Sequence, residues 1–308
     1  MLINREVLLA KVETTYNTDP TPTESANAIL VENISMKPAG ARMVERNAVR
    51  ASLAPLKQIY GGRLVELTFD VELKGSGTAG TAPELDSLLQ GCGFGVTIVP
   101  STSVTYAPVS TGFESVTFYY YQDGIRTIIT GAIGNMSATC KAGETGKLSF
   151  TFTGHVATPT DTAMASPTYS SIVPSVVLGL TFTVDSYAAK IDALSFDMTN
   201  EVSTPSSISA SDGYGQIRIA KRDVNGTIDP ESELVATKDY VNEWVSGADA
   251  ALTTGSIGAS AGNIINISMP AIHYREVTDG DRDGIRTQDI SFGAAESSGD
   301  DEITIAFT

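Results

Sequence analysis

The sequence predicts a mainly β protein made of two tandem, related domains, each with one short flanking α-helix. The first observation is a repeated pentapeptide: Asp123-Gly124-Ile125-Arg126-Thr127 returns as Asp283-Gly284-Ile285-Arg286-Thr287. The copies lie 160 positions apart (283 − 123) in a chain of 308 residues, which is close to half its length. The second observation is that Ser, Thr and Gly are abundant while long helical periodicity is absent. Self-similarity at such a spacing indicates a duplicated unit.

The segments around each pentapeptide recur in the same order, which strengthens the case for duplication. Each half opens with a strand, continues with a second strand and a short helix, reaches the pentapeptide and ends with a strand. In the first half these segments are residues 30–36, 64–73, 83–90, 123–127 and 148–153. In the second half they are residues 191–198, 216–228, 236–245, 283–287 and 303–308. We therefore expect the two pentapeptides to occupy corresponding places.

Local composition sets the expected domain boundaries. Residues 1–29 are rich in Thr, Pro and small polar residues after a short apolar run, so they predict an extended N-terminal arm. Residues 156–175, rich in Thr, Ser, Pro and Ala, predict a linker. The first domain then spans residues 30–155 and the second spans residues 176–308. Both sizes fit ordinary single domains.

Charge is distributed unequally between the halves. The chain has 20 Lys and Arg against 36 Asp and Glu, a net charge of −16. Up to residue 155 there are 12 basic and 14 acidic residues, and after it 8 and 22, so the halves carry −2 and −14. The two copies are therefore expected to face different surroundings. Such acidity argues against tight nucleic-acid binding, which needs cations to neutralise phosphates.

Cysteine use and hydropathy exclude several further classes. Two cysteines, Cys92 and Cys140, indicate neither a disulfide framework nor a metal site. Arg5, Glu6 and Lys11 interrupt the N-terminal apolar residues, so no secretory signal is expected. The most apolar run, residues 172–184, is too short to span a bilayer and predicts a buried strand instead.

The run from residue 64 to residue 73 alternates without a break, with Val65, Leu67, Phe69, Val71 and Leu73 on one face. This period of two predicts a strand with one face on a core and the other in water. Three of the four residues on the wet face are carboxylates. These are Glu66, Asp70 and Glu72. An ordinary solvated sheet face is the alternative reading of these carboxylates.

Each pentapeptide begins with Asp-Gly, which between strand-like runs is a strong signal for a tight hairpin turn. Asp123-Gly124 and Asp283-Gly284 are therefore predicted hairpin tips, with positive φ at both positions. Before the first tip, residues 119–121 are three successive tyrosines, which places aromatic rings on both faces of the strand. Such a strand must be covered on both sides, and a neighbouring subunit is one candidate for the cover.

Three motifs suggest chemistry, and each has a plainer interpretation. Residues 75–80 match G-x-G-x-x-G, but the preceding strand alternates and the glycines end before the helix, so a flexible loop is favoured over a dinucleotide site. Residues 279–284 resemble the start of a calcium loop, yet Ile290 stands where the bidentate Glu is needed, which favours an acidic turn. His155 and His273 have no partner at a motif spacing. We expect no catalytic residue, cofactor or metal.

The N-terminal residues resemble the opening of major tail proteins, the tail tube proteins of long-tailed, siphovirus-type bacteriophages. The similarity lies in Leu8-Leu9-Ala10-Lys11-Val12-Glu13-Thr14-Thr15-Tyr16-Asn17-Thr18-Asp19-Pro20-Thr21-Pro22-Thr23. Asn17 replaces the usual glycine, and both residue types tolerate left-handed backbone. Residues 27–30 continue the similarity, as does the run 218–231 followed by a helix. The resemblance covers the arm well and the two domains more loosely.

The resemblance implies a β-sandwich or partial-barrel fold with one flanking helix per domain. It also implies subunits that form rings, which stack into a hollow tube for genome delivery. Most members supply one such domain per chain and six chains per ring, so a chain with two domains suggests a trimer with pseudo-sixfold symmetry, or otherwise a hexamer. Glu66, Asp70 and Glu72 would then face the lumen and repel DNA, which would pass only transiently.

Further partners and the location follow from the same resemblance. They are the tape-measure, tail terminator and tail tip proteins, in a virion whose tail is assembled in the host cytoplasm without membrane insertion. Whether the tail is contractile stays open. A secreted or cell-surface β-sandwich that binds carbohydrate or calcium is the alternative from a different class, and an enzyme with an unfamiliar site is a third.

Overall fold

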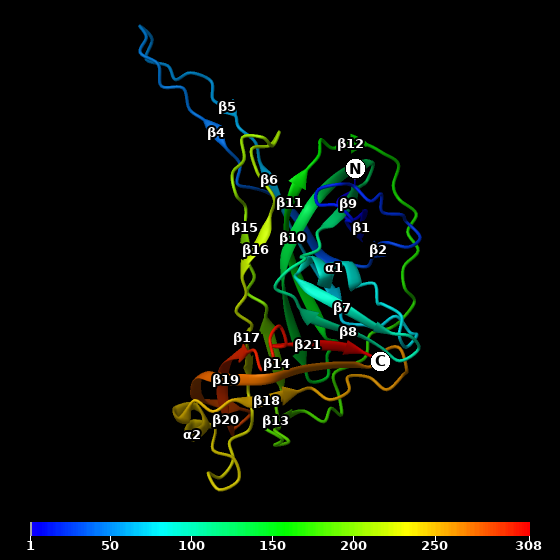
Figure 1. Ribbon diagram of the computed structural model, residues 1–308, viewed down its shortest axis with the longest axis vertical. Helices are drawn as coiled ribbons and strands as arrows, with labels where there is room; N and C mark the ends of the chain where they lie inside the picture. The colour runs from blue at the N-terminus through cyan, green and yellow to red at the C-terminus, as the bar shows by residue number, and fades with distance from the viewer. Residues whose placement is uncertain (1) are drawn as a thin grey trace.

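Strands dominate the computed structural model, which describes residues 2–308 (Figure 1). Within those residues 46% are strand and 4% are helix, which confirms the mainly β prediction. The elements up to residue 161 are β1 (Glu6–Val12), β2 (Ala28–Ile29), β3 (Glu32–Ala39), β4 (Met43–Val44), β5 (Ile59–Tyr60), β6 (Leu64–Glu72), α1 (Asp86–Gly91), β7 (Phe94–Val99), β8 (Ser103–Pro108), β9 (Val116–Gln122), β10 (Ile125–Lys141), β11 (Lys147–Val156) and β12 (Thr160–Asp161).

The remaining elements are fewer and mostly shorter. They are β13 (Thr183–Val184), β14 (Ala193–Asp197), β15 (Glu201–Ser203), β16 (Arg218–Lys221), β17 (Asn225–Ile228), α2 (Tyr240–Ser246), β18 (Ala250–Thr253), β19 (Ile265–Arg282), β20 (Ile285–Ala295) and β21 (Thr304–Phe307). Residues 172–184, expected as a buried strand, contribute only the two residues of β13. Pro174 and Gly179 interrupt the run, which explains why no longer strand forms there.

One antiparallel sheet passes through both halves in the order β3–β6–β11–β10–β14–β17–β20–β19. The junction is β10, whose first part pairs with β9 while Ser137–Lys141 pair with β14. A second junction joins β21, near the C-terminus, to β8 of the first half. The halves are therefore joined by strand pairing at two places.

The two halves repeat the same neighbour order. In the first half it is β9–β10–β11–β6–β3, and in the second it is β18–β19–β20–β17–β14. A short helix follows β6 and another follows β17 in the chain. In this alignment β7, β8 and β21 are additions to the repeated set.

The pentapeptides do not occupy matching places within this repeat. The first turn joins β9 to β10, whereas the second joins β19 to β20, the counterparts of β10 and β11. The expectation that they correspond is therefore wrong, because the same turn chemistry suits any tight hairpin. Both turns do have positive φ at both positions: 37° and 106° at Asp123 and Gly124, and 55° and 82° at Asp283 and Gly284.

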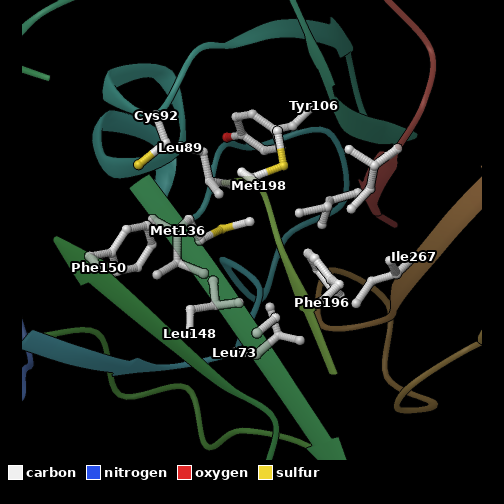
Figure 2. Packing of buried hydrophobic residues seen from close by; sticks show 14 of the residues in the cluster. Leu73, Leu89, Cys92, Tyr106, Met136, Leu148, Phe150, Phe196, Met198 and Ile267 are labelled. Carbon is white, nitrogen blue, oxygen red and sulfur yellow. The ribbon is translucent and has the colours of Figure 1, made fainter. Parts of the chain in front are cut away.

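A single hydrophobic core spans both halves. Figure 2 shows Leu73, Met136 and Leu148 of the first half packed in one cluster with Phe196 and Ile267 of the second. Each of these residues is at most 2% exposed to water. Burial of this kind is the main stabilising term in folding, so each half contributes to the stability of the other.

Residues 1–29 were expected to form an extended arm, and their described part, residues 2–29, is instead largely built into the first half. β1 pairs with β9 along its whole length, from Glu6 opposite Gln122 to Val12 opposite Val116. The buried carboxylate of Glu13 accepts hydrogen bonds from the side chains of Ser115 and Thr117, each 2.6 Å away. The apolar run at the start of the segment explains the correction, because it can bury against β9.

The expected linker, residues 156–175, lies along the first half (Figure 1). β12 pairs with the start of β10, and buried Ala165 packs in a cluster with Tyr119 and Tyr121. The opposite face of the tyrosine run, at Tyr120, belongs to the main core. The predicted cover on both faces of this strand is therefore supplied by the chain itself rather than by a neighbouring subunit.

Two hairpins project from the sheet, and the base of the first contacts the loop at the end of the second. The first connects β3 to β6 and carries β4 and β5, which pair only with each other. The second connects β14 to β17 and carries β15 and β16. Between them the Arg42 guanidinium lies 4.0 Å from the centre of the Tyr214 ring and donates to the Gly213 carbonyl (3.1 Å) and the Ser206 hydroxyl (2.8 Å).

Candidate functional site

One face of the shared sheet is polar across the junction between the halves. Residues opposite each other in antiparallel strands project to the same face, so the register defines continuous rows. One row contains Asp70, Ser149, Ser137, Asp197, Asn225 and Gly293. The next contains Glu72, Lys147, Thr139, Ser195, Thr227 and Ser291. The other face of the same strands carries the core. We call the first face the polar face.

The three carboxylates singled out from the sequence lie on the polar face along β6, and two of them have partners. Asp70 accepts from the Ser149 hydroxyl (2.6 Å) and from the Asn33 side-chain amide (2.8 Å). Glu66 forms an ion pair with Lys37 at 2.7 Å. Glu72 lies opposite Lys147 in the register. The acidity of β6 is therefore partly balanced by neighbouring strands.

The cation nearest to these carboxylates is held in its charged form. The Lys147 ammonium lies 2.7 Å from a carboxylate oxygen of Glu32, and this hydrogen bond together with the charge of Glu32 raises the pKa of Lys147. The charges of Asp70 and Glu72 act in the same direction. Because the pair is exposed, its contribution to stability is small. Its main effect is to fix a positive charge within an acidic row.

In the second half the polar face is bound together by short hydrogen bonds. The Asn135 amide donates to Asp197 (2.8 Å), which ties β10 to β14, and the Ser195 and Thr227 hydroxyls lie 2.7 Å apart. Arg275 lies over Gly293, where a Cβ would fall 2.4 Å from its guanidinium nitrogen. Only glycine leaves room for this side chain. Arg275 bonds Asp223 at 2.6 Å and lowers the pKa of that carboxyl.

Carboxylates outnumber cations on the polar face. The carboxylates on it or at its edge are Glu32, Glu66, Asp70, Glu72, Asp197, Asp223, Glu276 and Asp289, and the cations are Lys37, Lys141, Lys147 and Arg275. Between them lie mainly hydroxyl and amide side chains. Such a surface is well hydrated and offers no continuous track of cations to a phosphate backbone.

The predicted hairpin tips lie in turns away from the rows of the polar face. Asp123 accepts from the Leu2 backbone N–H (2.6 Å) and from Arg5 (3.0 Å), which together lower its pKa. Near the Asp283-Gly284 tip, Asp279 accepts two bonds from one Arg286 nitrogen (2.7 and 2.8 Å). No group of three or more metal-ligating side chains is found among residues 2–308. The structure thus gives both tips a role in turn formation.

The glycine-rich loop, residues 75–80, packs against the second half. A Cβ on Gly75 would lie 2.1 Å from the Gly262 carbonyl oxygen, and the Gly75 N–H donates to the Asn263 side chain at 2.7 Å. Close approach of two backbones therefore accounts for glycine at this position.

His155, for which the sequence offers no partner, is buried and lies in a partly buried three-residue chain of hydrogen bonds. Its Nδ1 is 2.6 Å from Asp212 and its Nε2 is 2.9 Å from the Tyr16 hydroxyl, which also accepts from the Ile217 N–H at 2.7 Å. Burial raises the pKa of Tyr16 to about 12, so its hydroxyl stays protonated. Partners 139 and 57 positions away give no sequence signal. This chain of bonds fixes elements to one another and contains no activated nucleophile.

Most of the polar face was not identified from the sequence. Ser149 and Thr151 alternate with Phe150 and Phe152 on β11, so a period-two signal was present there. No such signal links this strand to β14 or β17, because register between distant strands depends on tertiary pairing. No helix within residues 2–308 is long and apolar enough to cross a membrane.

Comparison with known proteins agrees with the mainly β fold. No curated protein sequence matches the chain significantly. The sequence model of a family described as "Phage tail tube protein" matches residues 3–307, nearly the whole chain. That family is structural, and it places its members in the tail of the virion. The extent of the match, from the N-terminal segment to the last strand, shows that this chain belongs to the phage tail tube protein family.

Proposed function

We propose that copies of this chain assemble into rings that stack to form the tail tube, the conduit for genome delivery. The observation that carries the proposal is the junction between the halves. There the edge of β10 at Ser137–Lys141 pairs with β14 and makes two repeats of the same strand order into one sheet. A sheet that continues from one repeat to the next within a chain can continue in the same way between chains.

The edges needed for that continuation are open. β3, the counterpart of β14, pairs only with β6 among the described residues. β19, the counterpart of β10, pairs with β20 from residue 276 to residue 282, and no other strand of the described chain pairs with it there. Unpaired sheet edges are prone to recruit another strand. We infer that β3 of one chain pairs with this part of β19 in the next chain.

The backbone geometry of β19 suits this pairing. Gln288, opposite Asp279, donates its N–H to the Pro230 carbonyl (2.9 Å) rather than to β19. Gln288 and Asp279 therefore form a non-hydrogen-bonded pair. In an antiparallel ladder, the two residues of such a pair direct their N–H and C=O groups away from each other. Asp279 therefore directs its N–H and C=O toward the open edge, where a neighbouring strand can accept and donate.

Each chain then fills two adjacent places in the wall. With the six domain positions that the family resemblance implies, three chains complete a ring with pseudo-sixfold symmetry. The polar face would line the lumen, with Glu66, Asp70 and Glu72 on it. A ring of three chains carries −48 (3 × −16), of which only charges within about 8 Å of the duplex act strongly at physiological salt. The lumen would keep DNA hydrated and mobile.

The tube would also contact other tail proteins. These are the tape-measure protein in its lumen, the terminator protein at one end and the tip protein at the other. Assembly in the host cytoplasm precedes the finished virion. No enzymatic step is part of this proposal.

Electron microscopy of the purified chain tests the assembly, and a proline variant tests the junction. Asp279→Pro removes the outward N–H of β19 without removing a bond to β20, and proline is tolerated on strand edges. Asp279→Ala is the matched control, because it also loses the bonds to Arg286 but keeps the N–H. We expect rings of three chains from the wild type and the Ala variant, and folded single chains from the Pro variant. Rings of six chains, or rings from the Pro variant, would contradict the proposed arrangement.

A further inference from the structure

The hairpin at residues 40–63, here called the basic hairpin, is the most exposed apolar segment of the chain. Met43, Val44, Ile59 and Tyr60 are each more than half exposed, and Val49 and Leu53 are fully exposed. The hairpin extends beyond the body of the molecule (Figure 1). Exposed apolar groups on this scale mark interaction sites in soluble proteins.

The same hairpin is positively charged in an acidic chain. It contains five of the 20 Lys and Arg residues, Arg42, Arg46, Arg50, Lys57 and Arg63, and a single carboxylate, Glu45, which gives +4 against −16 for the whole. No ion pair is formed by Arg46 or Lys57 with any described residue. Copies of a chain at −16 repel one another, so the hairpin is where attraction to another copy is strongest.

A second exposed apolar surface surrounds α2 and has the opposite charge. Its residues, here called the α2 patch, are Leu234, Val235, Val241, Trp244 and Val245, exposed by 38 to 77%. Residues 229–249 contain six carboxylates and one Lys, a charge of −5. Of these carboxylates Glu233, Asp239 and Asp249 form no ion pair with the described residues. The patch thus presents apolar side chains within an acidic border.

The contrast with α1 shows that the α2 patch lacks a cover. Leu88 and Leu89 of α1 are fully buried, and α1 packs against β1, β7, β9 and β10. α2 buries Tyr240 against Tyr274 on its inner side and packs mainly on β19. The second half has no counterpart of β1 to lie over its helix.

We propose that the basic hairpin of one copy docks on the α2 patch of another copy of this chain. The two surfaces lie toward opposite ends of the longest axis of the molecule, so they cannot meet within one copy (Figure 1). Apolar side chains meet apolar side chains, while Arg46, Arg50 and Lys57 meet Glu233 and Asp249. The contact uses two different surfaces head to tail, the kind of interface that repeats through an assembly.

This inference rests on the proposed self-assembly and adds its specific contact. It also explains why the two halves differ in charge. Complementary potentials steer association and set the register of a contact more than they set affinity. The acidic second half therefore selects the hairpin over the other, negatively charged surfaces of a neighbouring copy.

Disulfide trapping tests the contact directly. Val49→Cys on the hairpin and Val245→Cys on the α2 patch are made in separate chains, which are mixed and oxidised mildly during assembly. The native Cys92 and Cys140 are buried and do not compete. We expect a disulfide-linked pair of chains from the mixture and none from either variant alone. The matched control pairs Val49→Cys with Ile208→Cys, a fully exposed residue of the second hairpin.

Charge reversal supplies a second readout. Arg46→Glu with Arg50→Glu should raise the concentration needed for assembly about tenfold, and Glu233→Lys with Asp249→Lys in the mixing partner should restore it. Tubes that form without the Val49–Val245 link, or equal linking with Ile208→Cys, would overturn the contact and leave the tube intact. A wild-type chain that stays monomeric at every concentration would overturn both proposals.

Discussion

At the residue scale a few partly buried polar contacts join distant segments of the two halves. The chain from Tyr16 through His155 to Asp212 links the N-terminal segment, the end of β11 and the second projecting hairpin. The backbone of Gly62 approaches Asp212 so closely that a Cβ would lie 1.9 Å from its carbonyl oxygen. These contacts fix how the hairpins leave the sheet, and hence where they can meet a neighbour.

Removing the Tyr16 hydroxyl should destabilise the fold without altering its shape. Tyr16→Phe leaves the Ile217 N–H and His155 Nε2 without their partner, which costs about 1–3 kcal/mol because buried polar groups lose their hydrogen bonds. Urea unfolding followed by circular dichroism measures this. Tyr60→Phe is the control, since that residue is 59% exposed and should change stability by less than about 0.5 kcal/mol. Equal effects of the two substitutions would contradict the assigned role.

Asp212 should make stability depend on acid pH. Burial by itself would raise the pKa of Asp212, but hydrogen bonds from His155 and the Tyr214 N–H outweigh it and lower the pKa. A carboxyl with a lowered folded-state pKa contributes stability above its unfolded pKa of about 3.9, and this contribution is lost as pH falls through the folded value. The free energy of unfolding should therefore fall less steeply below pH ~4 in Asp212→Asn than in the wild type. Parallel curves would exclude this contribution.

At the element scale, exposure separates segments that bear on assembly from those that complete the fold. The expected arm and the expected linker are both packed on the first half, through β1 and Ala165. The basic hairpin has no such contacts beyond its base. Similarly α1 is covered and α2 is not. Elements of the same type thus serve different purposes in the two halves, which a repeated sequence pattern alone would not reveal.

A nonspecific protease should cut the free chain first in the basic hairpin, between residues 45 and 57. Exposed tips with few contacts are the usual sites of nicking. The segment 156–175, although its composition is that of a linker, should resist because Ala165 and β12 are packed. Mass spectrometry of early fragments identifies the sites, and assembled tubes should protect the hairpin. A first cut within 156–175 would show that this segment is not packed in solution.

At the scale of the whole molecule, the two halves form one unit. They share a core and two strand junctions, so neither has a complete hydrophobic surface of its own. This arrangement suits a wall component, because the relative position of two adjacent places in a ring is then fixed before assembly. In the proposed ring, each association event would add two places that are already in register.

Calorimetry should show a single unfolding transition for the whole chain. Phe196 of the second half packs with Leu73 and Leu148 of the first (Figure 2), so Phe196→Ala should lower the free energy of unfolding by about 3–5 kcal/mol and still leave one transition. Fluorescence of Trp244, the only tryptophan, reports the second half and should coincide with the calorimetric signal. Two separate transitions would mean that the halves fold independently.

Much of the fold could be predicted from local patterns. Period-two alternation places β6 and the start of β11, and Asp-Gly marks two tight turns correctly, because both signals depend on neighbours in sequence. Element boundaries were less well placed: residues 216–228, expected as one strand, form β16 and β17. The first helix, expected over residues 83–90, begins only at Asp86.

Short-range spacing and composition were sufficient to predict the mainly β fold class, the family and the strand that carries Glu66, Asp70 and Glu72. Three features became visible only in the folded chain: the pentapeptides are not equivalent, the arm and linker are packed, and the polar face continues from β6 through β14 to β20. The physical reason is that strand register and shared burial depend on contacts between residues far apart in the chain, and a single sequence carries no record of which distant strands meet.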